Sequence, residues 1–475
     1  MNVFERLASK AIHIPEILIP RQDIELSSWS VIACDQFTQD RDYWRQVEVE
    51  AGPGPSTLRL IFPEVFLDDP GRGERISAIH RTMKAYLGKS VFESFGQGIM
   101  YIERNTSRRP CRRGLVLAID LEHYDWAPDA RTLIRSTEGT VSERIPPRME
   151  IRRGAALESP HILLLIDDPG DRVMGILGQA AKKRKKAYQG NLMLDSGSVA
   201  GWLLDQTEDF NLLADEFELL ADTARTRYGP CGDRAEADRA AQDRPEGDRV
   251  RQKNPGEKPF LFAVGDGNHS LATAKAVWEE YKTGHQGEKG LENHPGRYAL
   301  VEVENIYDPG IDFEPIHRVI FGAGTELLDS LKALPGFTSR ILNSGSPDRD
   351  RARLSSLIAG RGTEQTRYGL VQGTLCVLIE TTAPGMAAVP LQPLLDAFIQ
   401  NHSGCSIDYI HGTEACLRLA SDQSRKAAAV LLPPVKKEDL FSTVAQSGPL
   451  PRKSFSMGEA REKRFYLECR KLFRG

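Results

Sequence analysis

The sequence lacks the features that would place it among secreted, disulfide-stapled or membrane proteins. Its seven cysteines are odd in number, widely scattered and without C-x-x-C spacing, so we expect neither a disulfide framework nor a zinc ribbon. No run approaches the roughly 18 to 20 apolar residues that span a bilayer. Residues 1–20 also lack the apolar core and cleavage site of a signal peptide. We therefore expect a cytoplasmic protein without a membrane partner.

The sequence also lacks a large excess of either positive or negative charge. The formal net charge of −4 gives no general electrostatic reason to expect nucleic acid as a partner. The five consecutive cations of Lys182–Lys186 are interpreted as a solvated helix end. The motifs G-x-x-x-x-G-K-[ST], G-x-G-x-x-G, H-E-x-x-H and G-x-S-x-G do not occur in a convincing context. The sequence therefore disfavours P-loop, Rossmann, zincin and α/β-hydrolase proteins. It does not indicate the oligomeric state.

What is present is a globular composition over 475 residues, 40% hydrophobic and 27% charged, which favours two or three domains. Short apolar runs alternate with helical patterns. We expect strands at Trp29–Cys34, Ile99–Arg104 and Gly114–Asp120, and a hairpin over Asn191–Leu204. The fold class expected is α/β to α+β, with one or more mixed sheets and flanking helices.

A charged segment divides this pattern. Residues 223–259 hold few apolar side chains and charges of both signs, so we expect a flexible insertion between an N-terminal α/β part, 1–222, and a C-terminal α/β part, 260–475. A solvent-exposed helix over residues 234–243 is the alternative for this segment.

The strongest chemical signal follows the insertion. The segment Gly265–Ser270 (GDGNHS) joins a buried-type strand at Phe260–Val264 to a helical pattern that begins at Leu271. Glycines on both sides of Asp266 let the backbone turn tightly and approach a ligand closely. Helix N-termini bind phosphate through their N–H groups and the helix dipole. An ordinary capped loop is equally consistent with so short a motif.

Two further clusters carry candidate ligand-binding side chains. The first cluster is Arg135–Thr140 with Arg144, a loop that holds two guanidinium groups. Guanidinium groups suit bidentate binding of phosphate or carboxylate. A solvated loop with surface ion pairs is the alternative. The second sets His317 beside Arg318, where a structural histidine is the alternative. Asp35, at the end of an apolar run, is either catalytic or a helix cap.

Together these segments resemble a bacterial and archaeal family, the domain of unknown function 1015. Its members carry, in order, an N-terminal aspartate, an Arg-His-Glu-x-Thr loop, a D-G-[HN]-H-R turn, a P-x-H-R segment and a C-terminal Met-Pro-x-Lys-Ser-Thr segment. The counterparts, in the same order, are Asp35, Arg135–Thr140, Asp266–Ser270, Pro315–Arg318 and Leu450–Phe455. The chain departs from the pattern at Ser136 and Thr137, which replace the central His, and at Ser270, which replaces Arg.

The turn also resembles the nucleotide-binding turn of the ParB and sulfiredoxin superfamily, which includes free-serine kinases. This resemblance implies a ParB/sulfiredoxin-like nucleotide-binding core with an additional domain. It implies ATP, or another nucleotide, and Mg²⁺, and phosphoryl transfer to a small hydroxyl compound such as free L-serine. The catalytic residues implied are Asp266, His269 and Asp35, with Asp266 also a magnesium ligand. The nucleotide- or phosphate-binding residues implied are Gly265, Gly267, Asn268, Ser270, Arg135, Glu138, Thr140, Arg144, His317, Arg318 and Lys453.

Two alternatives to a small-molecule kinase stay open. One is a ParB-type nucleotide switch that hydrolyses nucleotide without a phosphorylated product. The other is a metabolic paralogue whose site has degenerated, an interpretation favoured by Ser136, Thr137 and Ser270 at the family positions.

Overall fold

The computed structural model describes residues 1–106, 109, 111–228, 258–324, 326–360, 365–421 and 423–473. Contacts group the chain into two compact units. Unit 1 comprises Met1–Ile311 with Glu459–Gly475, and unit 2 comprises Asp312–Gly458. We expected a division at residues 223–259, whereas strands that follow this segment lie in the same sheet as strands that precede it. Residues 229–257, including the alternative helix at 234–243, lie outside the described residues.

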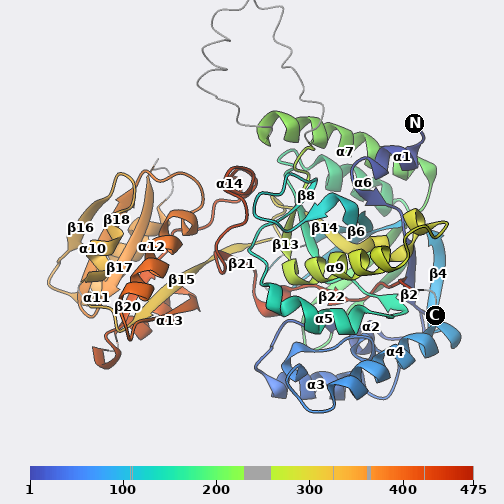
Figure 1. The fold of residues 1–475 in the computed structure, drawn as a ribbon, viewed down its shortest axis with the longest axis horizontal. Helices are drawn as coiled ribbons and strands as arrows, with labels where there is room; N and C mark the ends of the chain where they lie inside the picture. The colour runs from blue at the N-terminus through green and yellow to red at the C-terminus, as the bar shows by residue number, and fades with distance from the viewer. Residues whose placement is uncertain are drawn as a thin grey trace, which may run out of the picture. The chain divides into compact units, whose positions relative to one another are not determined.

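Unit 1 is built on a mixed sheet (Figure 1) whose described strands run in the order β11-β12-β5-β6-β14-β10-β13-β8-β7, with β1 beside β6. Antiparallel pairing joins β11 through β14, whereas β10 is parallel to β14 and β13 is parallel to β8. The strands of this sheet are β1 (Ile12–His13), β5 (Ile99–Asn105), β6 (Arg112–Asp120), β7 (Tyr124–Asp125), β8 (Ile134–Ser136), β10 (Leu163–Ile166), β11 (Tyr188–Asn191), β12 (Ser198–Leu204), β13 (Phe262–Asp266) and β14 (Tyr298–Asn305).

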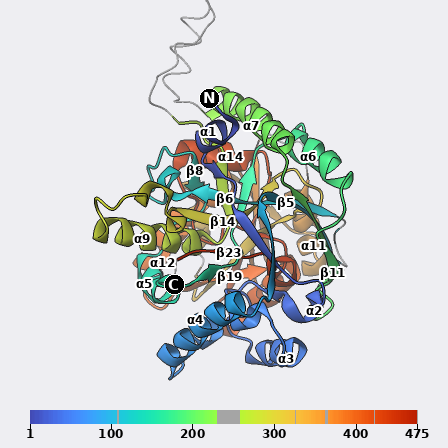
Figure 2. The same cartoon turned by 90° about the vertical axis from the view of Figure 1, so that its right-hand side faces the viewer.

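Alternation along the strands gives this sheet two apolar faces. In β6, Leu115 and Leu117 pack into one core and Val116 packs into the other, as the two-residue period of a strand requires. Figure 2 shows α1, α6 and α7 on one side of the strands and α2, α3 and α4 on the other. These helices and their neighbours are α1 (Val3–Ala8), α2 (Leu26–Trp29), α3 (Arg41–Ala51), α4 (Arg72–Gly88), α5 (Ile145–Arg152), α6 (Arg172–Lys182), α7 (Thr207–Tyr228) and α9 (Asn268–Gly284).

Short strand pairs bring the C-terminal segment back into unit 1. β22 (Phe465–Tyr466) pairs with β3 (Val31–Ile32), and β23 (Arg470–Lys471) pairs with β9 (Leu157–Glu158). A third pair joins β2 (Glu16–Pro20) to β4 (Phe92–Gln97). The apolar run Trp29–Cys34 is therefore a strand only in part, because Trp29 ends the helix α2.

Unit 2 is an antiparallel sheet between two pairs of helices, in the strand order β16-β18-β17-β20-β15-β19 with β21 beside β15. Helices α10 and α12 pack on one face of this sheet, and α11 and α13 pack on the other. Its strands are β15 (Phe313–Phe321), β16 (Thr338–Leu342), β17 (Thr366–Gln372), β18 (Leu375–Thr381), β19 (Ser406–His411), β20 (Ala428–Leu431) and β21 (Phe455–Met457). Its helices are α10 (Glu326–Leu331), α11 (Pro347–Ala359), α12 (Ala388–Asn401), α13 (Thr413–Ala420) and α14 (Asp439–Ser447).

The two sheets with flanking helices confirm the mixed α/β class expected from the sequence. Among the helices in the described ranges, none combines the length and the apolar character needed to cross a membrane.

Candidate functional site

The topology of unit 1 brings three chain segments to one edge of the sheet. β8 and β13 are parallel neighbours, so their carboxyl ends at Ser136 and Asp266 meet at the same edge. β10 runs antiparallel to β13, with Leu163 opposite Asp266, so the residues that precede β10 also lie there. His161 is therefore brought to the turn Gly265–Ser270, although the local sequence pattern around His161 gave no sign of it.

The turn between β13 and α9 requires glycine at one position. Gly267 has φ +81°, and a Cβ built there would lie 3.1 Å from the Cα of Ile162, so a side chain meets both backbone strain and backbone atoms. Helical hydrogen bonding begins with Leu271 N, which donates to Gly267 O at 2.9 Å. The N–H of Gly267 donates to Asp266 Oδ1 at 2.9 Å, and the N–H groups of Asn268, His269 and Ser270 precede the first hydrogen bond of that ladder, as the first N–H groups of a helix do.

Asn268 fastens the neighbouring loop to this turn. The buried Asn268 Oδ1 accepts hydrogen bonds from Ser136 Oγ at 2.5 Å and from Thr137 N at 3.2 Å. Thr137 Oγ1 donates to Val264 O at 2.5 Å. The two residues that replace the family's central His thus tie the loop to the strand that precedes the turn.

His269 contacts the same loop further along. Its Nε2 accepts a hydrogen bond from Val141 N at 3.2 Å. A ring nitrogen that accepts from a backbone N–H carries no proton, so in this geometry the imidazole of His269 is neutral and its hydrogen is on Nδ1.

Asp266 forms an ion pair that the sequence did not suggest. Its Oδ2 lies 3.0 Å from Lys463 Nζ, and its Oδ1 accepts from Gly267 N at 2.9 Å. The side chain of Lys463 is only 11% exposed, and that of Asp266 is 24% exposed. A lysine ammonium therefore stands at the glycine turn that opens a long helix.

The backbone around that lysine is anchored to the sheet by buried arginines. Arg104 donates to the carbonyl oxygens of Arg461 and Glu462 at 2.7 and 3.0 Å. Arg464 forms an ion pair with Glu302 at 2.8 Å. Since both arginines are buried, moving this segment would leave charges without partners in the interior, which costs several kcal/mol.

A cavity of about 150 Å³ lies beside the first turns of α9. Ser270 Oγ, His161 and Tyr466 form a chain in its lining, with Ser270 Oγ 2.7 Å from His161 Nε2 and Tyr466 Oη 2.9 Å from His161 Nδ1. Tyr466 Oη also lies 3.1 Å from Cys34 Sγ. Burial first, and then the nearby charge of Asp35, raises the pKa of the Cys34 thiol, which keeps this cysteine protonated.

Two carboxylates interact near the same cavity. Glu64 lines the cavity and accepts from Arg148 Nε at 2.9 Å. Burial raises the pKa of Glu64, Arg148 opposes that effect, and the charge of Asp35 adds to it. Asp35 itself follows β3 and accepts from Gln36 Nε2 at 3.0 Å. Asp35 and Glu64 are thus close enough to influence each other electrostatically.

The Arg135 loop is more integrated into the fold than its composition indicates. Arg135 is buried, donates from Nε to Thr132 O at 3.1 Å, and stacks its guanidinium 4.6 Å from the ring centre of Phe260. The carbonyl oxygen of Glu138 lies 2.7 Å from Ser136 Oγ, so it shares the single hydroxyl hydrogen of Ser136 with Asn268 Oδ1. The Oγ1 of Thr140 is buried without a hydrogen-bond partner among the described residues, and Arg144 is exposed.

His317, Arg318 and Lys453 belong to unit 2. His317 is buried, accepts at Nδ1 from Leu432 N at 3.1 Å and contacts Thr413 Oγ1 through Nε2 at 3.0 Å. Burial, with the charge of Arg318, lowers the pKa of His317 to about 4, so it is neutral near pH 7.

Arg318 is fully buried and donates from Nε to Gln392 Oε1 at 3.1 Å. Burial lowers the pKa of its guanidinium to about 10. Lys453 has φ +60°. The family roles of these residues stay predictions.

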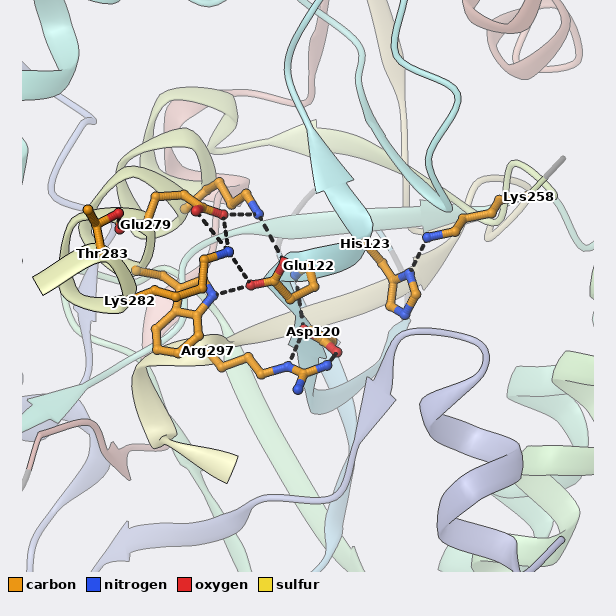
Figure 3. Close-up of polar contacts among 10 residues, drawn as sticks. Asp120, Glu122, His123, Lys258, Glu279, Lys282, Thr283 and Arg297 are labelled. Carbon is orange, nitrogen blue, oxygen red and sulfur yellow. Dashed lines mark hydrogen bonds and ion pairs between the residues drawn. The ribbon is translucent and has the colours of Figure 1, made fainter. Parts of the chain in front are cut away.

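The helix that carries the turn is fixed at its other end (Figure 3). Glu122, in a short 3₁₀ segment after β6, accepts from Trp278 Nε1 at 2.6 Å and from Lys282 Nζ at 2.8 Å. Burial tends to raise the pKa of Glu122, but the hydrogen bonds from Lys282 and Trp278 outweigh it and lower that pKa to about 2. Both donors lie on α9, so this carboxylate holds the helix against the sheet.

The predicted magnesium site rests on few ligands. Within the described part of the chain, no group of three or more His, Cys, Asp and Glu side chains could hold a metal ion. Magnesium at a nucleotide is often bound by only one or two carboxylates together with phosphates and water. Asp266 fits that minimal role only if an incoming metal displaces Lys463, because both of its oxygens already accept hydrogen bonds or pair with a cation.

Five residues at this edge were missed by the sequence analysis, namely Glu64, Arg148, His161, Lys463 and Tyr466. The one available signal was the charged stretch Arg461–Arg464 near the C-terminus, which lies beyond the Lys453 segment matched to the family pattern. Nothing in the local pattern around His161 distinguishes it from a residue at the start of an apolar strand.

Comparisons with known proteins place the chain in a family. None of the curated proteins matches it. Among solved structures, free serine kinase in complex with AMP is similar at 11% identity and TM-score 0.35, covering 75% of this chain and 92% of that one. A conserved hypothetical protein from Pyrococcus furiosus is similar at 11% identity and TM-score 0.33, covering 75% and 97%. SbnI with a C-terminal truncation from Staphylococcus aureus is similar at 10% identity and TM-score 0.33, covering 72% and 82%.

Residues 18–398, most of the chain, match the family described as "Protein of unknown function (DUF1015)". The chain belongs to the DUF1015 family.

Proposed function

We propose that the protein is a phosphotransferase that binds ATP at the Gly265–Ser270 turn and transfers its terminal phosphoryl group to a small hydroxyl compound. The observation that carries the proposal is the 3.0 Å pair between Lys463 Nζ and Asp266 Oδ2 at a glycine turn that opens a 17-residue helix. A cation and the backbone N–H groups of a helix N-terminus are together the elements that bind nucleotide phosphates.

On the phosphate side, the turn would supply backbone N–H donors and Lys463 would supply charge. Because Asn268 is tied to the Ser136–Thr137 loop, the N–H groups of the turn are oriented before the nucleotide arrives. Such pre-oriented donors stabilise charge that develops in a loose transition state without a reorganisation cost. His269 would donate a hydrogen bond from Nδ1 to a phosphate oxygen.

On the acceptor side, the cavity beside Ser270 would hold the hydroxyl compound. In the reaction the bond between the terminal phosphorus and the ADP oxygen breaks as a bond forms to the acceptor oxygen. The hydroxyl proton passes to the Asp35–Glu64 carboxylate pair. Asp266 is engaged by Lys463, whereas the raised pKa of Glu64 makes it a stronger base than an ordinary carboxylate. A bound Mg²⁺, with Asp266 as its protein ligand, would neutralise phosphate charge.

The test begins with nucleotide binding by the whole chain. Calorimetric titration with ATP, ADP and CTP, with and without Mg²⁺, is expected to show specific binding that Asp266→Ala weakens. Incubation with ATP, Mg²⁺ and a panel of alcohols and hydroxy amino acids is then expected to yield ADP and a phosphorylated product, and Asp35→Asn should slow the transfer. Absence of binding by every nucleotide would contradict the proposal. Hydrolysis without a phosphorylated product would support the nucleotide-switch alternative instead.

A further inference from the structure

The cavity beside α9 has a composition that constrains what it can hold. We propose that it takes an uncharged hydroxyl compound with an apolar body about the size of a benzene ring. That this compound is the phosphoryl acceptor rests on the proposed function. The chemical class of the ligand follows from the lining of the cavity, which lies within unit 1.

The size and the apolar wall come first. Leu60, Phe62, Met83, Ile151 and Leu157 contribute aliphatic and aromatic surface to the lining. A cavity of about 150 Å³ lined by such side chains holds a ligand of benzene size. Burying apolar surface of the ligand against this wall contributes about 25 cal/mol per Å². The body of the ligand is therefore apolar and small.

The charged groups of the lining already have partners of opposite charge. Glu64 is paired with Arg148, with 2.9 Å between Oε1 and Nε. Glu158 is paired with Arg152 at 2.7 Å and also with Arg470. Burial acts to raise the pKa of Glu158, but the two arginines outweigh it and lower that pKa, which keeps the carboxylate charged.

A free amino acid would bring both an ammonium and a carboxylate into this cavity. To pair them, it would have to break one of these ion pairs, and a buried charge without a partner is costly. An uncharged ligand leaves both pairs intact. The lining therefore favours a neutral alcohol over free L-serine.

The hydrogen-bonding chain fixes where the hydroxyl group lies. Tyr466 has one hydroxyl hydrogen, which goes either to Cys34 Sγ at 3.1 Å or to His161 Nδ1 at 2.9 Å. In the first case His161 Nε2 accepts from Ser270 Oγ, which can then accept from a ligand. In the second case His161 Nε2 donates to Ser270 Oγ, whose hydrogen can then go to a ligand. A hydroxyl group, which both donates and accepts, satisfies Ser270 in either state.

Binding by the full chain tests this inference without any requirement for turnover. Cyclopentanol and L-serine are the probes, and ligand-observed NMR or calorimetry measures their affinities. Cyclopentanol is expected to bind, and Ala155→Leu, which adds side-chain volume at a buried lining position, should weaken it by at least tenfold. Ser270→Ala should weaken it by about three- to tenfold. Ala78→Leu, at an exposed position of α4, is the matched control and should leave the affinity unchanged.

Each outcome separates this inference from the proposed function. Cyclopentanol binding that Ala155→Leu abolishes supports the inference even when no phosphoryl transfer occurs. Transfer to L-serine at a site insensitive to Ala155→Leu overturns the inference and leaves the phosphotransferase proposal standing. If Ala155→Leu fails to fold, Ser270→Ala decides: an unchanged affinity for cyclopentanol overturns the inference. Failure of the wild-type chain to bind cyclopentanol also overturns it.

Discussion

Lys463 Nζ lies 3.0 Å from Asp266 Oδ2, although the two residues come from distant parts of the chain. The pair forms because β22 pairs with β3 and the buried Arg104 and Arg464 hold the C-terminal segment near the edge where β13 ends. This pair of mostly buried side chains stands at a glycine turn with a helix N-terminus, so its cation lies where a phosphate can replace the carboxylate.

The first prediction is that Lys463→Met weakens ATP binding without unfolding the protein. A hydrogen bond to a charged group contributes about 1.5–3 kcal/mol, so the dissociation constant should rise by about 10- to 100-fold. Calorimetric titration measures this change. Lys471→Met is the matched control, since the ammonium of Lys471 is exposed and pairs with Glu16 at 3.4 Å. If wild type and Lys463→Met bind ATP with equal affinity, Lys463 does not contact the nucleotide.

The second prediction compares two glycines on the same helix. Gly267→Ala should destabilise unit 1 by more than about 1 kcal/mol, because an alanine at φ +81° is strained and its Cβ meets Ile162. Gly284→Ala, at the far end of α9, has open space around the added Cβ and should be neutral or stabilising by up to about 1 kcal/mol. Urea denaturation measures both changes. Equal effects of the two substitutions would show that the turn relaxes easily.

The local pattern of the sequence was enough to predict the elements around the turn. The hairpin expected over Asn191–Leu204 is confirmed in its turn and in its second strand, β12, whereas its first strand, β11, lies earlier than expected, at Tyr188–Asn191. The apolar run Phe260–Val264 and the helical spacing after Leu271 correspond to β13 and α9, shifted by two or three residues at their starts. Periodicity and turn chemistry act over a few residues, so elements of this kind can be read from them.

The partners of the turn could not be predicted in the same way. His161 precedes a strand that runs antiparallel to β13, and Lys463 precedes a strand that pairs with β3. Which strands become neighbours is decided by the packing of the whole sheet, and local propensity does not predict that choice. Arg135 shows the converse, because a composition suited to phosphate binding is compatible with a guanidinium that stacks on Phe260 inside the fold.

The third prediction concerns the carboxylate that anchors α9. The pKa of Glu122 is lowered to about 2 in the folded protein, below its ordinary value of about 4.3. Its contribution to stability is therefore fully present above pH 4.3 and is lost as the pH falls towards 2. The cost of Glu122→Gln, measured by urea denaturation, should be larger at pH 6 than at pH 3. Glu280→Gln, an exposed position on the same helix, should cost less than about 0.5 kcal/mol at both pH values. A cost for Glu122→Gln that does not change with pH would contradict the anchoring role.

The fourth prediction concerns unit 2 and separates a structural histidine from one that binds phosphate. Burial and the charge of Arg318 lower the pKa of His317 to about 4, and an unfolded histidine has a pKa of about 6.5. Below pH 6.5 the unfolded state binds a proton that the folded state does not, so the stability of unit 2 should decrease as the pH falls from 6.5 to 4, by at most about 3 kcal/mol. His317→Asn, whose Oδ1 can accept from Leu432 N in place of Nδ1, should remove this pH dependence, as measured by urea denaturation at pH 7 and pH 5. His402→Asn, at the end of α12 in the same unit, serves as the control and should retain it. NMR of ring-labelled histidine then gives the pKa of His317 directly. A pKa above 6 in the nucleotide-free protein would contradict a buried structural histidine and favour one that binds phosphate.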